Sequence, residues 1–341
     1  MGAAKKPGDA PRVPDGSRRP AEPYGAARIL GNRPKLEVPA PTPSVLPPKK
    51  PAPAAGPPER ARLTWARFRS YVKLEHTLFS VPVLLAAALL GEGHWPRWDR
   101  LLAILLAAAG ARTAGMSANR IVDRFLDAHN PRTAARELPA GRMNLAQAIV
   151  VTGVAVGVYL AGAWYLGPLC LTLSPVPLLV FWGYPYLKRF TPLAHFGVGL
   201  SLAQAPLGAY LAVHPVIRDT LLQAGPLALF TWLWVAGFDI IYGTLDVDFD
   251  RGHGLHSMPA DWGVERALTV SGWLHFLAFC ALTWVTLSHW LKPAPVVALA
   301  ACGALLFLEH QKALDVELAF FKFNAWLSFA VLGVVLAGTY L

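Results

Sequence analysis

Apolar residues dominate the chain from about residue 76 to its end, in stretches separated by short polar segments. A helix needs roughly 20 apolar residues to cross the hydrocarbon core of a bilayer, and these stretches approach or exceed that length. Prolines at several junctions separate neighbouring stretches, because proline lacks the N–H that a helix interior requires. The predicted membrane-spanning helices cover nine ranges: residues 76–93, 101–119, 144–165, 168–186, 194–214, 225–245, 266–290, 293–311 and 319–341.

Composition supports the same class. The 341 residues are 54% hydrophobic and only 15% charged, with 12 tryptophans and a mean hydropathy of +0.39. These values lie outside the range of soluble globular domains. We therefore predict an all-α fold, a polytopic membrane bundle of about nine transmembrane helices. Cys170, Cys280 and Cys302 lie inside apolar stretches without paired spacing, so we interpret them as packing residues.

The first 59 residues differ from the remainder. They hold 15 of the 30 prolines, with ten Lys and Arg against five Asp and Glu, and show no helical period. Such a segment cannot bury a core, which predicts a disordered, basic, Pro-rich tail at residues 1–59 before a transmembrane domain at residues 60–341. No apolar segment follows Met1, so we expect the first membrane helix to serve as the targeting signal.

The distribution of positive charge orients the predicted bundle. Segments on one side carry sixteen Lys and Arg residues, while the alternate segments carry only Arg97, Arg100, Arg218 and Lys292. The positive-inside rule places the richer side in the cytoplasm and the C-terminus on the other side. The net charge of +10 could suggest nucleic acid. The cations, however, flank membrane helices and no reader motif appears, so anionic membrane lipid is the expected partner and nucleic acid is not.

A charged stretch, NRIVDRFLDAHNPRTAARELPAGR, begins at the cytoplasmic end of the second predicted helix. Within it, Asn119, Asp123 and Asp127 recur at four-residue intervals and would share one helical face. Two carboxylates on one face repel each other, and the cost rises near hydrocarbon. One alternative is a solvated helix end in which Arg120 and Arg124 neutralise the acids.

A second acidic segment weakens that alternative. Between the sixth and seventh predicted helices, FDIIYGTLDVDFDRGHGLHSMP places Asp239, Tyr242, Asp246 and Asp250 at i, i+3, i+7 and i+11. That spacing predicts one helical face, from which Asp248 would project away. Two acidic faces at cytoplasmic helix ends are better explained by a shared function than by solvation.

Oxygen ligands without thiolates or an HExxH pair favour Mg²⁺, which binds through one or two carboxylates together with substrate phosphate oxygens. We interpret His253 and His256, beside loop glycines, as solvated. The same predicted surface offers four cations for phosphate oxygens. They are Arg132, Arg136, Lys188 and Arg189. A phosphate ester that faces a membrane bundle indicates a lipid tail, so the pattern predicts a lipid diphosphate as substrate.

At these residues the sequence resembles the UbiA superfamily of intramembrane polyprenyltransferases, over about residues 63 to 341. The family pattern NxxxDxxxD is matched by Asn119, Asp123 and Asp127. The pattern DxxYxxxDxxxD is matched by the second segment, and YPYLKRFT resembles the family's YPxxKR segment. The stretches VKLEHTLFSVP and LDVDFDRGHGLHSMP resemble the 4-hydroxybenzoate polyprenyltransferase-like branch. The Pro-rich tail is not covered by the resemblance.

The resemblance implies Mg²⁺-dependent transfer of a polyprenyl group from polyprenyl diphosphate to an aromatic hydroxy acid. The acceptor would be 4-hydroxybenzoate or a dihydroxynaphthoate, in ubiquinone or menaquinone biosynthesis. It further implies a multi-pass protein of the inner (cytoplasmic) membrane with its active site facing the cytoplasm. Haem farnesyl transfer is disfavoured, because the acceptor-side loops do not read like that branch.

The same resemblance implies a role for each site residue. Asp123 and Asp127 would bind one Mg²⁺, and Asp246 and Asp250 another. The diphosphate would be bound by a group of polar residues: Asn119, Arg132, Arg136, Lys188 and Arg189. Asp239, Tyr242 and Lys188 would be catalytic, with Asp239 and Tyr242 forming the polar floor where the acceptor meets the allylic carbon.

A cation-binding membrane transporter is the alternative from another functional class. Paired carboxylates inside a membrane would suit a transported metal ion. The four cations on the same side count against it, because they would repel a metal that carries no anionic ligand.

Overall fold

The computed structural model describes residues 64–73, 77–313 and 322–341. The predicted tail at residues 1–59 lies outside them. The described part is entirely helical, as predicted. Its elements, in chain order, are α1 (Trp65–Val72), α2 (Thr77–Glu92), α3 (Trp98–His129), α4 (Leu145–Leu166), α5 (Pro168–Leu173), α6 (Pro175–Gly183), η2 (Tyr184–Arg189), α7 (Ala194–Val213), α8 (Ile217–Asp219), η3 (Thr220–Ala224), α9 (Gly225–Gly243), η4 (Thr244–Asp246), α10 (Val247–Gly252), α11 (Met258–Trp262), α12 (Val264–His289), α13 (Pro293–Gln311) and α14 (Asn324–Tyr340).

Within the described ranges, seven helical segments are long and apolar enough to cross a membrane, and two shorter apolar helices accompany them. The shorter ones fall in α2 and α14. Their order matches the nine predicted ranges, and the protein is a multi-pass membrane protein. The predicted helix at 168–186 is divided into α5, α6 and η2, since Pro175 and Pro185 interrupt the backbone hydrogen bonds.

Local sequence signals set several helix ends. Asn144 and Gln147 form a reciprocal capping box at the start of α4. Gly167 ends α4 with φ of +134°, a backbone conformation that residues other than glycine rarely adopt. Pro168 starts α5.

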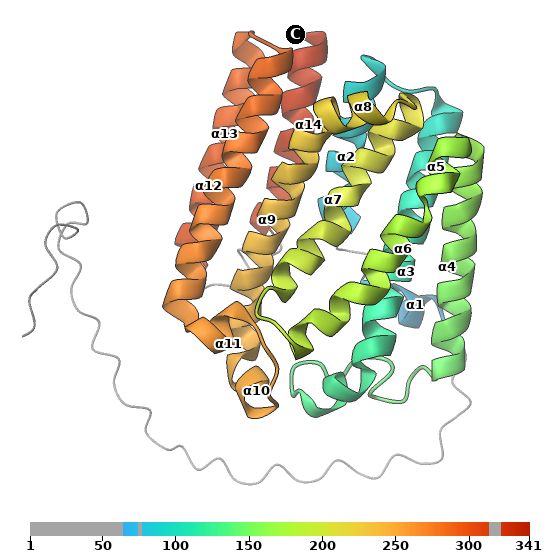
Figure 1. The fold of residues 1–341 in the computed structure, drawn as a ribbon, viewed down its shortest axis with the longest axis vertical. Coiled ribbons are helices and arrows are strands. Elements are labelled where there is room, and N and C mark those ends of the chain that lie inside the picture. The colour runs from blue at the N-terminus through green and yellow to red at the C-terminus, as the bar shows by residue number, and fades with distance from the viewer. Residues whose placement is uncertain (1–63, 74–76, 314–321) are drawn as a thin grey trace, which may run out of the picture. The chain divides into compact units, whose positions relative to one another are not determined.

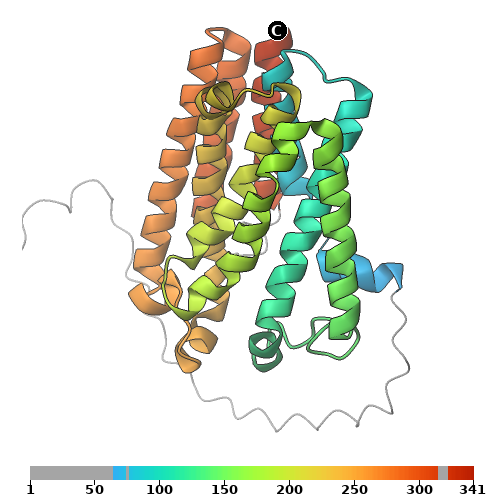
Figure 2. The ribbon, with the colours of Figure 1, turned by 45° about the vertical axis from the view of Figure 1, so that its right-hand side comes forward.

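Small residues allow close helix packing. A side chain at Gly110 would come within 2.7 Å of the Ala155 carbonyl oxygen, so α3 and α4 approach at backbone distance. Figure 2 shows these two helices running side by side, and they form the most extensive helix pair in the bundle. Such contacts between small residues are typical of helices that associate inside membranes.

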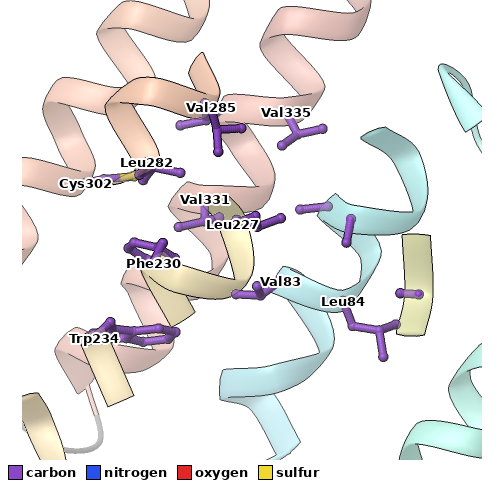
Figure 3. Packing of buried hydrophobic residues seen from close by; sticks show 14 of the residues in the cluster. Val83, Leu84, Leu227, Phe230, Trp234, Leu282, Val285, Cys302, Val331 and Val335 are labelled. Carbon is purple, nitrogen blue, oxygen red and sulfur yellow. The ribbon is translucent and has the colours of Figure 1, made fainter. Parts of the chain in front are cut away.

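The main apolar core lies between α2, α9, α12, α13 and α14. Figure 3 shows Val83 of α2 on the side of the labelled residues of the other four helices, and Leu84 on the opposite side of α2. Trp234 and Phe230 of α9 stack within it at a ring-centroid distance of 5.5 Å. Cys302 is buried there as a free thiol, in agreement with its predicted packing role.

The bundle has a polar end. Figure 1 places α10, α11 and the loop that follows α3 at one end of the bundle, and α8 with the C-terminus at the other. The two acidic segments of the sequence therefore lie at the same end.

Candidate active site

The first acidic motif lies on α3. This helix continues to His129, beyond the predicted end at residue 119, because the polar side chains after Asn119 face the protein interior instead of the bilayer. Asp123 and Asp127 are buried, with 2% and 6% of their surfaces exposed. The Asn119 side-chain amide donates to Asp123 Oδ2 at 3.3 Å. The predicted shared helical face is therefore present.

The second acidic motif does not lie on one continuous helix, and that prediction was wrong. Helix α9 ends at Gly243, a 3₁₀ turn follows through Asp246, and α10 carries Asp250. The tighter 3₁₀ turn changes the angle between successive side chains, so helical spacing does not hold across it. Asp239, Tyr242, Asp246 and Asp250 nevertheless line one cavity, while Asp248 is exposed, as predicted.

That cavity has a volume of about 210 Å³. Its lining residues come from α3, η2, α7, α9, η4 and α10, and from the loops that follow α3 and α10. Five carboxylates and three Lys or Arg side chains line it. The acids are Asp123, Asp127, Asp239, Asp246 and Asp250, and the cations are Arg132, Arg136 and Lys188. Acids outnumber cations, so the site has capacity for added positive charge.

Basic side chains contact both carboxylates of α3. The Lys188 ammonium donates to Asp123 Oδ2 at 2.6 Å, and Arg189 Nη2 lies 3.3 Å from Asp123 Oδ1. Arg136 Nη1 bonds both oxygens of Asp127, at 2.7 and 2.8 Å. All three cations are 25 to 29% exposed at the side chain, while the acids are nearly enclosed. Cations that were predicted to bind diphosphate thus lie beside the acids that were predicted to bind Mg²⁺.

Arg132 connects two residues of the second motif, Tyr242 and Asp246. Its guanidinium contacts both oxygens of Asp246 and donates to the Tyr242 hydroxyl at 2.7 Å. The Asn130 amide also donates to Asp246, at 2.9 Å. Burial opposes the charge of Arg132, but these partners outweigh it and raise the pKa of the guanidinium. Arg132 is therefore positively charged where it lines the cavity.

Asp250 has a different environment. It accepts a hydrogen bond from the Ser257 hydroxyl at 2.8 Å. Ser257 is also the N-cap of α11 and accepts from the Ala260 amide. A short helix start therefore fixes the position of this carboxylate.

The alternative that Arg120 and Arg124 neutralise the acids of α3 is not what the structure shows for Arg124. That side chain donates to the Ile121 carbonyl and covers the Phe125 ring. Arg120 is buried, at 3% exposure, and interacts electrostatically with Asp127 and Glu137. Direct ion pairing of the α3 acids comes from Arg136, Lys188 and Arg189 instead.

Sequence reasoning missed several residues of this site. His195 lies at the start of α7 with Nδ1 2.7 Å from Asp239 Oδ2, and Asn130 and Ser257 hold Asp246 and Asp250. A histidine inside an apolar helix was the available signal for His195. Asn130 and Ser257 carried no such signal in the sequence, since Asn and Ser are common in loops. His256, which we interpreted as a solvated loop residue, lines the cavity and pairs with Asp261 at 2.9 Å.

The donor set suits Mg²⁺. Five carboxylates converge on one cavity with no thiolate among its lining residues, and these are the hard ligands that Mg²⁺ prefers. Across the described ranges, no three His, Cys, Asp or Glu side chains gather closely enough to enclose a metal by themselves. Mg²⁺ commonly completes its ligand set with water and substrate phosphate oxygens.

Comparison with known proteins agrees with this geometry. Residues 80–338 match the family described as the UbiA prenyltransferase family. A protein named 4-hydroxybenzoate octaprenyltransferase from Vibrio vulnificus is 29% identical over 287 residues, which cover 82% of this chain and 96% of that protein.

Solved structures show the same fold. A UbiA homologue from Aeropyrum pernix K1 in its apo form aligns with a TM-score of 0.68 and 32% identity, covering 77% of this chain and 96% of that one. A UbiA homologue from Archaeoglobus fulgidus bound to GPP and Mg²⁺ aligns with a TM-score of 0.59 and 16% identity, covering 81% and 100%. Homologues of this fold thus bind Mg²⁺ together with a prenyl diphosphate.

Proposed function

The chain belongs to the UbiA prenyltransferase family, and from this premise we propose that it transfers a polyprenyl group from polyprenyl diphosphate to an aromatic hydroxy acid. The acceptor is 4-hydroxybenzoate or a dihydroxynaphthoate, and the product is a precursor of ubiquinone or menaquinone. The relative named 4-hydroxybenzoate octaprenyltransferase supports this acceptor class.

The observation that carries the proposal is the meeting of both acidic motifs with three cations around one cavity. Acidic residues alone would suit a metal ion. Cations alone would suit an anion. Their combination suits a metal and a diphosphate together, because the diphosphate binds to both. A transported cation would give Arg132, Arg136 and Lys188 no anionic partner beyond the acids that it must itself occupy.

We assign Asp123 and Asp127 to one Mg²⁺ ion and Asp246 and Asp250 to a second. When bound, Mg²⁺ supplies positive charge that stabilises the departing diphosphate. The contacts with Lys188, Arg136 and Arg132 offset the repulsion between closely spaced carboxylates. Asn119 adds a neutral oxygen beside the first pair.

The same cations also bind the diphosphate. Arg132, Arg136 and Lys188 line the cavity and can turn from the carboxylates to the oxygens of the diphosphate, as Arg189 can from the outer side of Asp123. These side chains hold the head group in place and stabilise the charge that develops as the allylic C–O bond breaks. Apolar side chains such as Leu126 and Val198 line the same cavity and exclude water from the allylic carbon.

Asp239 and Tyr242 are proposed to form the acceptor floor. Both line the cavity from α9, before the 3₁₀ turn that carries Asp246. The Tyr242 hydroxyl accepts a hydrogen bond from Arg132, so the acceptor floor is joined to the diphosphate end. This link orients the aromatic ring toward the carbon that it attacks.

The active site is proposed to face the cytoplasm from the inner membrane. Support comes from the sixteen-to-four cation asymmetry of the sequence, whose richer side includes the loop after α3. The polar end of the bundle holds the cavity, where a soluble acceptor can enter while the prenyl chain stays in the bilayer.

The test is mass spectrometry of membranes that contain the protein, incubated with Mg²⁺, prenyl diphosphates of several lengths and a panel of aromatic acids. We expect one prenylated acceptor above membranes that lack the protein. An absence of prenylated product with every acceptor, with the protein intact, would contradict the proposal. Thermal stabilisation by Mg²⁺ alone as large as that by Mg²⁺ with a prenyl diphosphate analogue would favour an ion carrier.

A further inference from the structure

His195 joins three elements of the cavity wall. It lies near the start of α7, its Nδ1 is 2.7 Å from Asp239 Oδ2 on α9, and the Met258 backbone nitrogen at the start of α11 lies 3.4 Å from its Nε2. The His195 side chain is 7% exposed and that of Asp239 is 24% exposed. Both residues line the cavity, and the carboxylate is the more exposed of the two.

The two neighbours determine where the imidazole carries its proton. A backbone N–H can only donate, so Met258 requires a lone pair on Nε2. The ring proton of neutral His195 is then on Nδ1, which donates it to Asp239 Oδ2. A doubly protonated ring would direct an N–H at the N–H of Met258. Asp239 thus receives one neutral hydrogen bond from His195 and keeps its other lone pairs for the cavity.

The surroundings keep the ring in this place. A side chain at Gly243 would approach the His195 ring to 3.0 Å, so the absence of one lets α9 pass close to the imidazole. Tyr184 on η2 and Asp250 on α10 line the same cavity as His195 and Asp239. Met258 adjoins Ser257, which holds Asp250. His195 therefore connects the acceptor floor to the segment that fixes the second acidic motif.

We infer that Asp239 accepts the proton of the acceptor's ring hydroxyl and that His195 is the positioning residue that holds Asp239 for this task. The inference rests on the proposed function. A carboxylate repels the acid group of the acceptor and attracts its hydroxyl, so the ring enters with the hydroxyl toward Asp239. His195 and Asp239 come together only in the fold, since 44 residues separate them.

The proton and electron changes are as follows. A ring carbon next to the hydroxyl bonds to the allylic carbon while the allylic C–O bond breaks and its electron pair leaves with the diphosphate. The hydroxyl proton passes to Asp239, which leaves a neutral dienone. The hydrogen on the alkylated carbon is then lost as a proton to the released diphosphate, and Asp239 returns its proton to the oxygen. The aromatic phenol is restored, with one prenyl group gained and one proton transferred to diphosphate.

The experiment compares two acceptors in the full-length protein. One is the acceptor that gives product with the wild type. The other is its monofluorinated analogue, with one ring position beside the hydroxyl left free, whose hydroxyl is more acidic. For each acceptor the rate of His195→Leu is divided by that of the wild type, so the weaker nucleophilicity of the fluorinated ring cancels.

His195→Leu is expected to lower turnover by about 10²-fold with the ordinary acceptor, the lower end of what proton-transfer catalysis contributes. With the fluorinated acceptor the loss should shrink several-fold, because less assistance is needed. His195→Asn keeps an N–H near the former Nδ1 and should recover most of the activity. His214→Leu is the matched control, since His214 ends the same helix, pairs with Asp219 at 2.9 Å and lies at the opposite end of the bundle.

Equal loss with both acceptors would overturn the inference, as would a rise in KM for prenyl diphosphate that matched the loss of turnover. If His195→Leu fails to fold, as judged by lost thermal stabilisation with Mg²⁺ and a prenyl diphosphate analogue, Asp239→Asn carries the same comparison. For Asp239→Asn, the loss of turnover relative to the wild type should be several-fold smaller with the fluorinated acceptor. An equal loss with both acceptors would contradict the inference. Lack of product from the wild type with every acceptor would instead refute the proposed function.

Discussion

The Lys188 ammonium lies 2.6 Å from Asp123 Oδ2, and the two residues belong to η2 and α3, which are 65 positions apart in the chain. Together with Arg189, which lies 3.3 Å from Asp123 Oδ1, the lysine offsets the charge of a buried carboxylate one helical turn from Asp127. The same geometry holds Lys188 at the cavity, where it can exchange its carboxylate partner for a phosphate oxygen.

Lys188→Ala should raise the KM for prenyl diphosphate roughly tenfold or more and change that of the aromatic acid much less. The reason is that a hydrogen bond to a charged group contributes about 1.5–3 kcal/mol, and we assign this one to the diphosphate. Kinetics with each substrate varied at saturating levels of the other will separate the two constants. Lys292→Ala, at the opposite end of the bundle, is the control. A defect confined to the aromatic acid would move Lys188 to the acceptor pocket.

The four carboxylates assigned to Mg²⁺ should each be needed for turnover. Substitution of Asp123, Asp127, Asp246 or Asp250 by Ala is expected to reduce the rate by about 10²-fold or more, and chelation of Mg²⁺ should abolish it. Asp248→Ala is the matched control, since Asp248 is exposed and does not line the cavity. Equal sensitivity at Asp248 would show that general acidity of this segment, and not the cavity, accounts for the losses.

Topology can be tested with two cysteines at opposite ends of the bundle. In a variant without the native cysteines, Asp248→Cys lies at the end that holds the cavity, and Leu221→Cys on η3 is 60% exposed at the other end. A membrane-impermeant thiol reagent added to intact cells should label only the second. Labelling of both from outside would contradict the cytoplasmic orientation of the site.

Glu137 links α1 to the loop that carries Arg132 and Arg136. It accepts a hydrogen bond from the Ser70 hydroxyl at 2.6 Å. Burial favours the neutral acid, but this bond, its backbone hydrogen bond and the nearby Arg120 outweigh it and lower the pKa of Glu137. A lowered folded-state pKa stabilises the protein above the ordinary pKa of a glutamate, and that stability is lost as the pH falls through the folded value.

Glu137→Gln should therefore lower the free energy of unfolding by about 1 kcal/mol at pH 7, near the net value of one hydrogen bond. The difference from wild type should vanish once the pH is low enough to protonate Glu137 in the folded protein. Thermal unfolding in detergent between pH 7 and pH 3 measures both. A difference that stayed constant over this range would mean that the carboxylate charge is not involved.

A buried polar chain joins α9, α13 and α14. Trp234 Nε1 donates to Asn324 Oδ1 at 2.6 Å, and the Asn324 amide donates to Glu309 Oε1 at 2.9 Å. Asn324→Ala should destabilise the protein by about 1–3 kcal/mol, because it leaves buried polar partners unsatisfied. Phe329→Ala, on the exposed face of the same helix, should change the unfolding temperature much less. A similar fall in unfolding temperature for both variants would argue against a stabilising role of the polar chain.

The sequence by itself determined the class, the helical segments and the acidic motifs of this protein. Hydrophobic length and helical period are local properties, so the ranges around α4, α7 and α13 could be predicted closely. The same locality explains why Asn119, Asp123 and Asp127 could be placed on one face. A single uninterrupted helix guarantees that relation without any tertiary contact.

Tertiary structure decided what lies next to each acid. The pairing of Arg136 with Asp127 and of His195 with Asp239 depends on how separate helices are rotated and offset against each other. The break after Gly243 likewise arises where α9 meets its neighbours, and spacing alone predicted a continuous face there. Apolar patterns specify that a helix faces a partner or lipid, but many rotations and offsets bury similar area. Close packing of small residues and satisfaction of buried charges select among them, and both exist only in the folded protein.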